Sequence, residues 1–551
     1  MQRKKKFLAL LLVVSLVFIA ACSKGNTEEN KPQPNNGPTT EGDKPSAPVE
    51  LTMFRDVSGD IKFKPGESMD NNLIYDAIEK DLNIRLKNIW VADAAQYQQK
   101  LQMSISANDI ADLMQISLMQ MQQLIEADMI MDLTDVFEQY ATPETKAYMT
   151  GDGGKQMDSA KVNGRLMAIP STGSPYGSST QIWIRRDWLK QLGLPEPKTM
   201  DDVLAIARAF AAKDPGGTGK NYAFPLTRDF LNDGTFDIKG FFNGYHAYPG
   251  QWVKDENGSL VYGSIQPQVK VALQELQNLY KEGLLDTEFA VKDVAKVNEL
   301  LASNQIGIAY GPFWLSYYPL FDNAVKDGKL VQDWWPYPIV SHDAEPALSQ
   351  IELGVGSYYV VSKSAKHPEA VIQLLNKWVQ AYNDPQEGDE VYLYRSEDSS
   401  NYWKINPIRV NSQTETLMLG QWVPEAVEAK DGSKLTGLEA PDRYNKIMKY
   451  LDGDAKEWAE YPLSGPDGAL SIMYDYFEQD RYKFNEFFGA PGPAMTEKLA
   501  VLTDKINEVF TKIVMNQIPI EEFDKLVEQF DNLGGKQITE EVNTWYQSTA
   551  N

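Results

Sequence analysis

The sequence predicts an α/β protein with more than one domain, and three observations support this. Short apolar runs with strand character alternate along the chain with amphipathic segments of helical period. At roughly 100–200 residues per domain, a chain of 551 residues is longer than one domain usually needs. The chain is 42% hydrophobic and 24% charged, which is typical of a folded protein and excludes a largely disordered one.

The first 21 residues are predicted to be a secretory signal peptide. Arg3 and the lysines at positions 4–6 precede an apolar run over residues 7–21. That run is shorter than the roughly 20 residues that a membrane-spanning helix needs. Cys22, the only cysteine, follows two alanines, and this pattern resembles the lipobox of bacterial lipoproteins. The resemblance implies cleavage before Cys22 and lipidation of its sulfur; the alternative is a buried thiol behind an uncleaved anchor.

Residues 22–48 are predicted to be the lipidated cysteine and a disordered tether. Residues 23–48 contain five prolines and no large apolar side chain, so they cannot form a core. Removal of residues 1–21 deletes four positive charges and changes the formal charge from −24 to −28. An anionic lipid surface repels such a body, so the acyl chains must provide the attachment. We therefore expect a protein on the extracellular face of the cell membrane, in a Gram-positive bacterium.

Strands and helices alternate through the body of the chain. The expected strands cover residues 49–54, 84–89, 111–116 and 181–185, and the pattern predicts a mainly parallel sheet. Thr199, with Asp202 three residues later, is a helix start signal for residues 199–211. A second helix is expected to begin near Pro368, and a third carries apolar residues from 499 to 513. The Gly534-Gly535 pair predicts a helix end.

Charge and composition exclude several functions. With 53 Lys and Arg against 77 Asp and Glu, the chain lacks the basic face that nucleic acid requires. One cysteine and three histidines exclude a disulfide framework and a Cys/His zinc site, and leave little material for a histidine-based triad. No Walker loop, G-x-S-x-G or H-E-x-x-H motif occurs. We expect no cofactor and no enzymatic activity.

Several segments together resemble the extracellular solute-binding proteins of ABC transporters, in the class that includes maltose-binding protein. GRLMAIP at 164–170, followed by IWIRRDWL at 182–189, resembles the crossover of that class into its second lobe. NQIGIAYGPFW at 304–314 and GVGSYYVV at 354–361 resemble later strands near the cleft. FNEFFG at 484–489 and the segment 533–543 are similar to long Gram-positive sugar-binding lipoproteins of the LplA and LipO type. Alginate-oligosaccharide-binding proteins are more distantly similar.

The resemblance implies a two-lobed, periplasmic-binding-protein-like fold of type II, with hinge crossings and a helical C-terminal extension. The first lobe is expected at residues 49–170 and 336–385, and the second at residues 171–335. Residues 386–551 are expected to be mainly helical and to pack on the second lobe and the hinge. The implied function is delivery of a carbohydrate, an oligosaccharide, to an ABC import permease by a monomeric, lipid-anchored protein. Such proteins close around their ligand, and the closed state docks on the permease.

Aromatic side chains are the leading candidates for sugar binding, because flat rings cover the C–H faces of sugars. In the resembled class an aromatic residue at the position of Trp314 stacks on sugar; the alternative is a core tryptophan. Other candidates follow glycines or lie in the loop GYHAYPGQW at residues 244–252, which otherwise packs on itself. The candidates are Trp314, Trp183, Trp252, Tyr310, Trp335, Tyr358, Arg185, Trp403 and His246.

Two of these candidates have explicit alternatives. Trp183 alternates with Ile182 and Ile184, so it faces either the cleft or a second packed face. Arg185 either binds an acidic sugar through both guanidinium nitrogens or pairs with a nearby acid.

Residues 214–223 align with a calcium loop found in some relatives. Asp214, Thr218 and the Lys220 carbonyl remain as oxygen donors, while Gly216, Tyr222 and Ala223 occupy positions where the family places oxygen ligands. Too few charges remain to offset dehydration of the ion, so we expect no metal there.

Two other functions stay open on the sequence alone. With 77 acidic residues, a carboxylate pair at glycosidase-like spacing is expected by chance, so a cell-surface glycoside hydrolase or lyase is an alternative. A sensory or adhesive lipoprotein that uses the same cleft is another.

Overall fold

The computed structural model describes residues 47–57, 61–232, 234–393, 401–437 and 439–549. Residues 45–551 form one compact unit, and everything below concerns that unit. The predicted signal peptide, Cys22 and the tether up to residue 46 lie outside the described residues. In the described ranges, no helix has both the length and the apolar character that crossing a bilayer requires.

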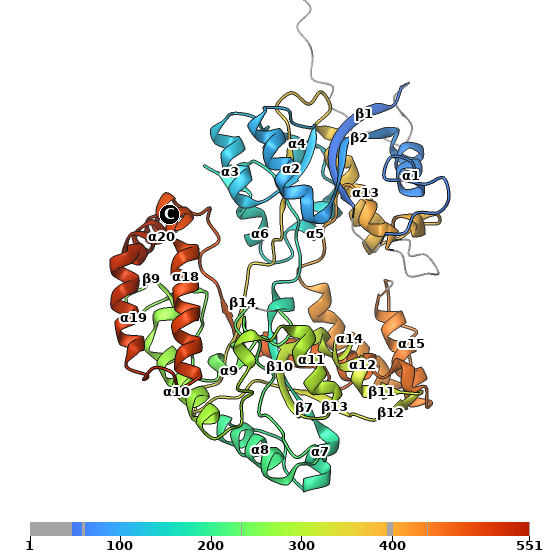
Figure 1. Cartoon of the computed structure of the whole chain (residues 1–551). Coiled ribbons are helices and arrows are strands. Elements are labelled where there is room, and N and C mark those ends of the chain that lie inside the picture. The colour runs from blue at the N-terminus through green and yellow to red at the C-terminus, as the bar shows by residue number, and fades with distance from the viewer. Residues whose placement is uncertain (1–46, 58–60, 233, 394–400, 438, 550–551) are drawn as a thin grey trace, which may run out of the picture. The chain divides into compact units, whose positions relative to one another are not determined.

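A five-stranded sheet forms the first part of the fold (Figure 1). Its spatial order is β2-β1-β3-β15-β6, with β1 parallel to β2 and β3, and β15 antiparallel to β3 and β6. The strands are β1 (Val49–Val57), β2 (Ile84–Asp93), β3 (Leu113–Ile116), β6 (Ile169–Pro170) and β15 (Tyr358–Val361).

The helices on this sheet supply one face each to a common core. Asn72 caps the first of them through the N–H groups of Ile74 and Tyr75, and Ser117 forms a capping box with Gln120. The helices are α1 (Leu73–Leu82), α2 (Ala94–Ser106), α3 (Leu118–Glu126), α4 (Thr134–Tyr140), α5 (Pro143–Met149), α6 (Lys155–Asp158) and α13 (Glu369–Asn383), and a hairpin of β4 (Lys161–Val162) and β5 (Arg165–Leu166) lies among them. We call these elements the first-sheet group.

A three-stranded sheet organises the second part of the fold, in the order β10-β7-β13. Both β10 (Ile308–Pro312) and β13 (Trp334–Tyr337) run antiparallel to β7 (Thr180–Arg185). The prediction of a mainly parallel sheet was therefore wrong for this sheet and holds only in part for the first. The reason is that β13 and β15 return from distant segments, so no strand–helix–strand crossover fixes their direction.

The two faces of β7 are both buried, in two different cores. Ile182 and Ile184 belong to the core that includes residues of α8 and α10, whereas Trp183 belongs to the core that includes residues of α14 and α17. The elements of the first core are α7 (Arg186–Leu192), α8 (Met200–Lys213), α9 (Lys239–Asn243), α10 (Pro267–Lys281), β8 (Trp252–Lys254) and β9 (Leu260–Tyr262). The core that contains Trp183 includes α11 (Val294–Ala302), α12 (Leu320–Ala324), β11 (Val325–Lys326) and β12 (Lys329–Leu330). The predicted Thr199–Asp202 capping box opens α8.

The C-terminal residues are mostly helical. The helices α14 (Glu415–Ala429), α15 (Glu439–Leu451), α16 (Glu460–Ser464) and α17 (Ala469–Glu478) build the core around Trp183, and we include them with β7, β10 and β13 in the second-sheet group. Then β16 (Tyr482–Phe484) pairs with β14 (Ser349–Ile351).

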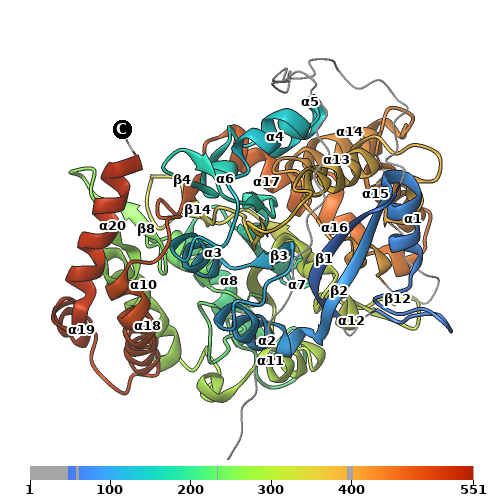
Figure 2. The ribbon, with the colours of Figure 1, turned by 90° about the horizontal axis from the view of Figure 1, so that it is seen from above.

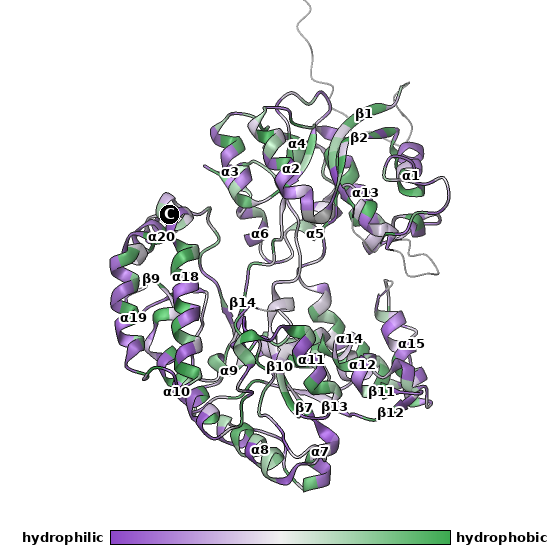
Figure 3. Cartoon of the chain, in the orientation of Figure 1, coloured by the Kyte–Doolittle hydropathy of each residue, from purple (hydrophilic) through white to green (hydrophobic). Residues whose placement is uncertain are grey.

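Three further helices gather beside α10 at the end of the chain (Figure 2). They are α18 (Pro493–Val514), α19 (Glu522–Phe530) and α20 (Lys536–Thr549). Their hydrophobic stripes alternate with hydrophilic ones (Figure 3), as expected for helices that bury one face. Gly534 adopts φ +120 at the break before α20, where the sequence predicted a helix end.

The chain passes between the two groups at three places. These are residues 171–179 after β6, 338–357 before β15, and 406–414 before α14. The segments lie side by side, because the Ser171 N–H donates to the Ser357 carbonyl at 2.8 Å and the Asn411 N–H donates to the Thr172 carbonyl at 3.0 Å. The two sheets are thus connected by hydrogen-bonded extended segments.

Candidate functional site

A pocket of about 550 Å³ draws its lining from both groups. From the first-sheet group come residues of α13, together with Trp403 from the turn at residues 402–405, which packs on the core of that group. From the second-sheet group come residues of α14, α15, α16 and the turn after β10. Its lining residues are Tyr317, Trp378, Tyr382, Trp403, Asn411, Glu415, Glu439, Asp442, Arg443, Lys446 and Glu460. Because distant segments build it, no local motif of the sequence reveals it.

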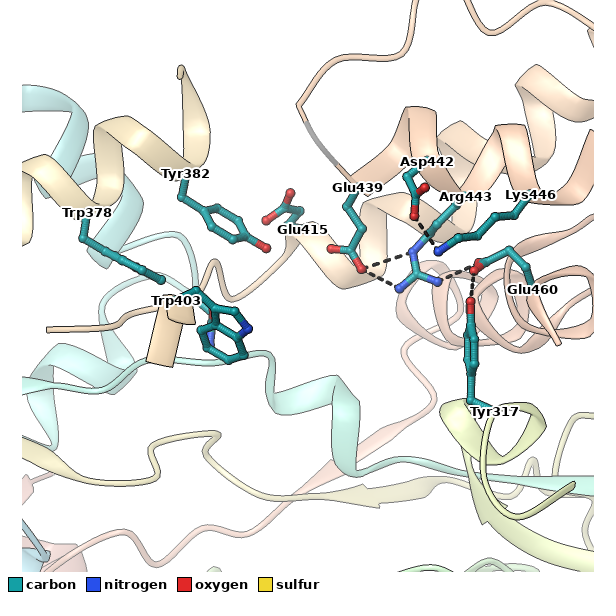
Figure 4. A pocket seen from close by; sticks show the side chains of 11 residues that line it. Tyr317, Trp378, Tyr382, Trp403, Glu415, Glu439, Asp442, Arg443, Lys446 and Glu460 are labelled. Atoms are coloured by element: carbon teal, nitrogen blue, oxygen red, sulfur yellow. Dashed lines mark hydrogen bonds and ion pairs between the residues drawn. The ribbon is translucent and has the colours of Figure 1, made fainter. Parts of the chain in front are cut away.

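One wall of the pocket is aromatic. Trp378 and Tyr382 are four residues apart on α13, so both lie on one face of that helix, with ring centroids 6.1 Å apart. Trp378 is buried and its indole N–H donates to the Val410 carbonyl at 2.6 Å. Trp403 is half-buried, and its indole N–H donates to the Asn401 side chain at 3.2 Å. Tyr382 and Trp403 lie on the same side of the pocket (Figure 4).

The opposite wall is charged and already paired. Arg443 on α15 donates to the carboxylate of Glu439 through Nε at 3.1 Å, and to Glu460 through Nη1 at 2.7 Å. Glu460 also accepts hydrogen bonds from the hydroxyls of Ser464 and Tyr317. Lys446 pairs with Asp442 at 2.6 Å (Figure 4). Both cations that line the pocket therefore have anionic partners.

The pKa values of this wall follow from burial and from these pairs. Burial lowers the pKa of Arg443, but the carboxylates of Glu460 and Glu439 outweigh it, so the pKa is raised and the guanidinium stays charged. Burial, together with the charge of Glu460, raises the pKa of Tyr317.

Glu415, the first residue of α14, lies between the two walls (Figure 4). Burial, and then the negative charge of Glu439, raises the pKa of its carboxyl to about 7. Among the described contacts, no hydrogen bond or ion pair engages this carboxylate; only the Glu415 backbone N–H is bonded, to Ser412. Glu415 is thus a polar group available to a ligand in the pocket.

A second cavity, of about 480 Å³, lies next to the C-terminal helices. It is lined by Phe487, Ala490, Gly492, Met495 and one side of α20, including Trp545. Its lining includes no residue of the first-sheet group. We therefore regard the pocket that involves both groups as the better candidate site.

Of the nine residues predicted to bind a ligand, Trp403 lines the candidate pocket. Trp314 is half-buried in the turn after β10, three residues before Tyr317. His246 is half-buried and its Nε2 lies 3.0 Å from Asp343. The role of these three in ligand binding stays a prediction.

The other six predicted residues are buried, and none of them lines the pocket. Arg185 donates to Asp187 at 2.8 and 2.6 Å and to Asn304 at 2.8 Å, so its guanidinium is engaged within the protein. Trp183 lies in the second packed face that the sequence left as an alternative. Their exposed fractions are 0% for Trp183, 2% for Arg185 and Tyr310, 3% for Trp252, 4% for Tyr358 and 6% for Trp335. Their predicted contact with a ligand has no support in this arrangement and stays a prediction.

The loop that aligns with a calcium site closes on its own hydrogen bonds. The carboxylate of Asp214 accepts from the N–H groups of Thr218 at 3.0 Å and Gly219 at 2.8 Å, and from the Asn221 amide at 2.6 Å. The Thr218 hydroxyl donates to the Lys220 carbonyl at 2.7 Å. Both carboxylate oxygens of Asp214 and the Lys220 carbonyl therefore accept hydrogen bonds within the loop itself.

Sequence signals existed for parts of the pocket that the sequence analysis missed. Glu439, Asp442, Arg443 and Lys446 repeat at helical spacing, which places them on one face of α15. Tyr382, four residues after Trp378, extends the face of α13 that was interpreted only as core. Tyr317 and Glu415 carry no such signal, since each reaches the pocket through the tertiary arrangement.

The chain is similar to proteins of known class. A family model described as bacterial extracellular solute-binding protein matches residues 69–381. Lipoprotein LipO of Bacillus subtilis (strain 168) is 22% identical over 570 residues, which cover 100% of this chain and 99% of LipO. The fructooligosaccharide ABC transporter substrate-binding protein FusA of Streptococcus pneumoniae serotype 4 is 25% identical over 303 residues, which cover 51% of this chain and 52% of FusA.

A solved structure is similar over most of the chain. It is an HMO binding ABC-transporter associated solute-binding protein from Bifidobacterium longum infantis ATCC 15697. The TM-score is 0.64 at 15% identity, and the match covers 91% of this chain and 99% of that one. At this identity the similarity concerns the fold.

Proposed function

Because this chain belongs to the bacterial extracellular solute-binding proteins, we propose that it binds an oligosaccharide outside the cell and delivers it to an ABC import permease. The family and the periplasmic-binding-protein-like fold expected from the sequence motifs are confirmed. In this proposal the first-sheet and second-sheet groups are the two lobes and the three crossings are the hinge. The lobe boundaries given by the sequence stay a prediction.

The observation that carries the proposal is the pocket shared by the two groups. It combines aromatic rings on one side with hydrogen-bonding groups on the other, the combination that a sugar ring needs. A ligand that touches both groups binds more tightly when they approach each other, so it shifts the protein toward a closed state. A permease that recognises the closed state can then distinguish loaded from empty protein.

The relatives support a carbohydrate as the ligand. FusA is named as a fructooligosaccharide-binding component of an ABC transporter. FusA and the Bifidobacterium longum infantis protein are named as binding proteins, and we propose that this chain likewise binds its sugar without changing it. LipO is named as a lipoprotein and aligns over the whole chain, which supports lipidation of Cys22 and attachment to the membrane.

The charges of the pocket favour an uncharged sugar. Four carboxylates and two cations line it, and both cations are engaged by Glu439, Glu460 or Asp442. Among the described residues that line the pocket, no cation is left for a uronic acid, whose carboxylate would approach Glu415 and Glu439. Like charges in a partly desolvated site repel each other strongly. We therefore propose a neutral oligosaccharide, with Glu415 accepting hydrogen bonds from its hydroxyls.

Replacement of Trp403 by alanine is expected to weaken sugar binding by about 1–3 kcal/mol, roughly 5- to 150-fold in Kd, because a stacking ring is lost. Calorimetric titration with neutral fructo-, xylo- and galacto-oligosaccharides measures this. Trp422→Ala removes an exposed tryptophan of α14 outside the pocket and should bind as the wild type does. Trp314→Ala, in the same series, tests the position predicted from the sequence.

Three outcomes bear on the proposal. Folded Trp403→Ala with wild-type affinity would remove the pocket from consideration. Chromatography of the sugar after incubation should show it unchanged, and shorter products would favour the hydrolase alternative. Failure of every oligosaccharide to bind the wild type would contradict the proposed function itself.

The charge of the ligand is tested with matched sugars. We expect the wild type to bind a galacto-oligosaccharide at least about tenfold more tightly at pH 8 than the galacturonate oligomer of the same length, because Glu415 is then ionised. Both are titrated at low ionic strength, where electrostatic effects are largest. Tighter binding of the galacturonate would overturn the neutral-ligand proposal while leaving sugar binding intact.

A further inference from the structure

Two of the three histidines in the chain meet at one place, away from the pocket. His246 follows α9, and His342 lies in the segment after β13. Asp343 lies between them: its Oδ1 is 3.0 Å from Nε2 of His246, and its Oδ2 is 3.6 Å from Nε2 of His342. One ligand atom of each residue lies within 4.8 Å of the others. The third histidine, His367, pairs elsewhere with Glu369.

The backbone holds the two histidine segments against each other. The His342 N–H donates to the Gly244 carbonyl at 2.9 Å. A side chain at Gly244 would come within 2.5 Å of the Val340 carbonyl oxygen and 2.4 Å of Met200, so only glycine permits this approach. The ring of Tyr245 stacks on His342, with centroids 5.0 Å apart and an interplanar angle of 19°. The two imidazoles are therefore positioned by the fold rather than by chance contact of mobile side chains.

A further group orients the carboxylate. The Ser341 hydroxyl donates to Oδ1 of Asp343 at 2.9 Å and lies 3.4 Å from Nε2 of His246. Ligating carboxylates in metal sites are typically held by such outer hydrogen bonds.

We propose that His246, His342 and Asp343 form a binding site for a divalent transition-metal ion, with zinc as the best match. Zinc takes imidazole nitrogen and carboxylate oxygen at about 2.0–2.2 Å in tetrahedral geometry, which places ligand atoms about 3.3 Å apart. The observed separations need small side-chain rotations to reach this. The side chains are 25%, 36% and 41% exposed, so an ion can enter and water can take the fourth position.

The types of donor atom in this site favour zinc over hard cations such as calcium and magnesium. Calcium and magnesium prefer all-oxygen sites, whereas two of the three donors here are nitrogen. The site also differs from the loop at residues 214–223, which supplies only oxygens. A bound ion would tie the segment after α9 to the segment after β13, and the second of these also holds the start of α8, because the Met200 N–H donates to the Ser341 carbonyl at 2.9 Å.

The test is zinc titration of the full chain without an affinity tag, after removal of metal by a chelator. The expected result is one zinc per chain and a higher melting temperature with zinc, since an ion that binds only the folded state stabilises it. His246→Ala and His342→Ala should each weaken binding at least about tenfold. His367→Ala, the matched control, should bind as the wild type does. Millimolar calcium or magnesium should not compete.

The zinc affinities of the variants and of the wild type decide whether this metal site exists. Unchanged zinc affinity in both folded histidine variants, or no binding to the wild type at millimolar zinc, would overturn the site. If either histidine variant fails to fold, Asp343→Asn gives the same test at an exposed side chain, and wild-type affinity there would also overturn it. These results are independent of whether the protein binds sugar.

Discussion

Replacement of Arg443 by methionine is expected to lower the free energy of unfolding by about 3–5 kcal/mol, the range for breaking a buried ion pair from one side. The guanidinium pairs with Glu460, whose side chain is only 1% exposed, and with Glu439 on its own helix. In the variant, Glu460 keeps hydroxyl donors from Ser464 and Tyr317 but loses its only described cationic partner. The cause of the destabilisation is thus an uncompensated charge in the protein interior.

Urea denaturation followed by tryptophan fluorescence measures the effect. Lys446→Met is the matched control: Lys446 is on the same helix and also lines the pocket, but its partner Asp442 is 59% exposed. A loss of at most about 1 kcal/mol is expected there. The double variant Arg443→Met with Glu460→Leu should recover part of the stability, because the orphaned charge is gone. Equal destabilisation by the Arg443 and Lys446 variants would contradict the explanation.

Replacement of Glu415 by glutamine is expected to remove a loss of stability with rising pH. The folded-state pKa of about 7 exceeds the ordinary value of 4.5 for a glutamate, so between these values the folded protein keeps a proton that the unfolded chain has released. Stability therefore falls as pH rises through this window. At roughly 1.4 kcal/mol per pKa unit, the variant should be more stable than the wild type by about 2–3 kcal/mol at pH 8 and about equal at pH 4.

Denaturation midpoints between pH 4 and pH 8 test this. Glu428→Gln changes an exposed carboxylate of the same helix and should follow the wild-type profile. A difference between Glu415→Gln and the wild type that does not vary with pH would contradict the assignment. Such a result would mean that packing, and not ionisation, separates the two proteins.

Much of the architecture could be predicted from the sequence. The strand at residues 181–185 and the helix that follows Thr199 were identified from alternation and from a cap, both of which are local properties. The order of several individually weak motifs along the chain was enough to predict the family. The direction of a strand could not be predicted from local sequence. β15 joins its sheet only after the chain crosses from the other group, and β13 joins β7 after the chain has passed through α12 and the β11–β12 hairpin. Nothing in the residues of these two strands encodes which way they run.

The sequence predicted that aromatic residues would line the candidate site, but it identified few of the residues that do. Aromatic residues do line the pocket, yet Trp403 was the one predicted member, and the six buried candidates pack into cores or engage partners inside the protein. In the sequence, a tryptophan or an arginine that is buried in a core cannot be distinguished from one that lines a cleft. The sequence alone cannot show which one a given position occupies, because the neighbours that cover it come from elsewhere in the chain.

The sequence by itself was enough to predict the family and the alternation of strands and helices, because both depend on patterns of consecutive residues. The same holds for the predicted export and lipid signal, which stays a prediction. The tertiary structure alone decided that Trp183 is buried in the core that includes α14 and α17, and that Glu415 lies between an aromatic and a charged wall. It also brought His246 to Asp343 across 97 positions of the chain. The physical reason is that burial, pairing and charge depend on which distant segments meet, and packing of the whole chain selects those meetings.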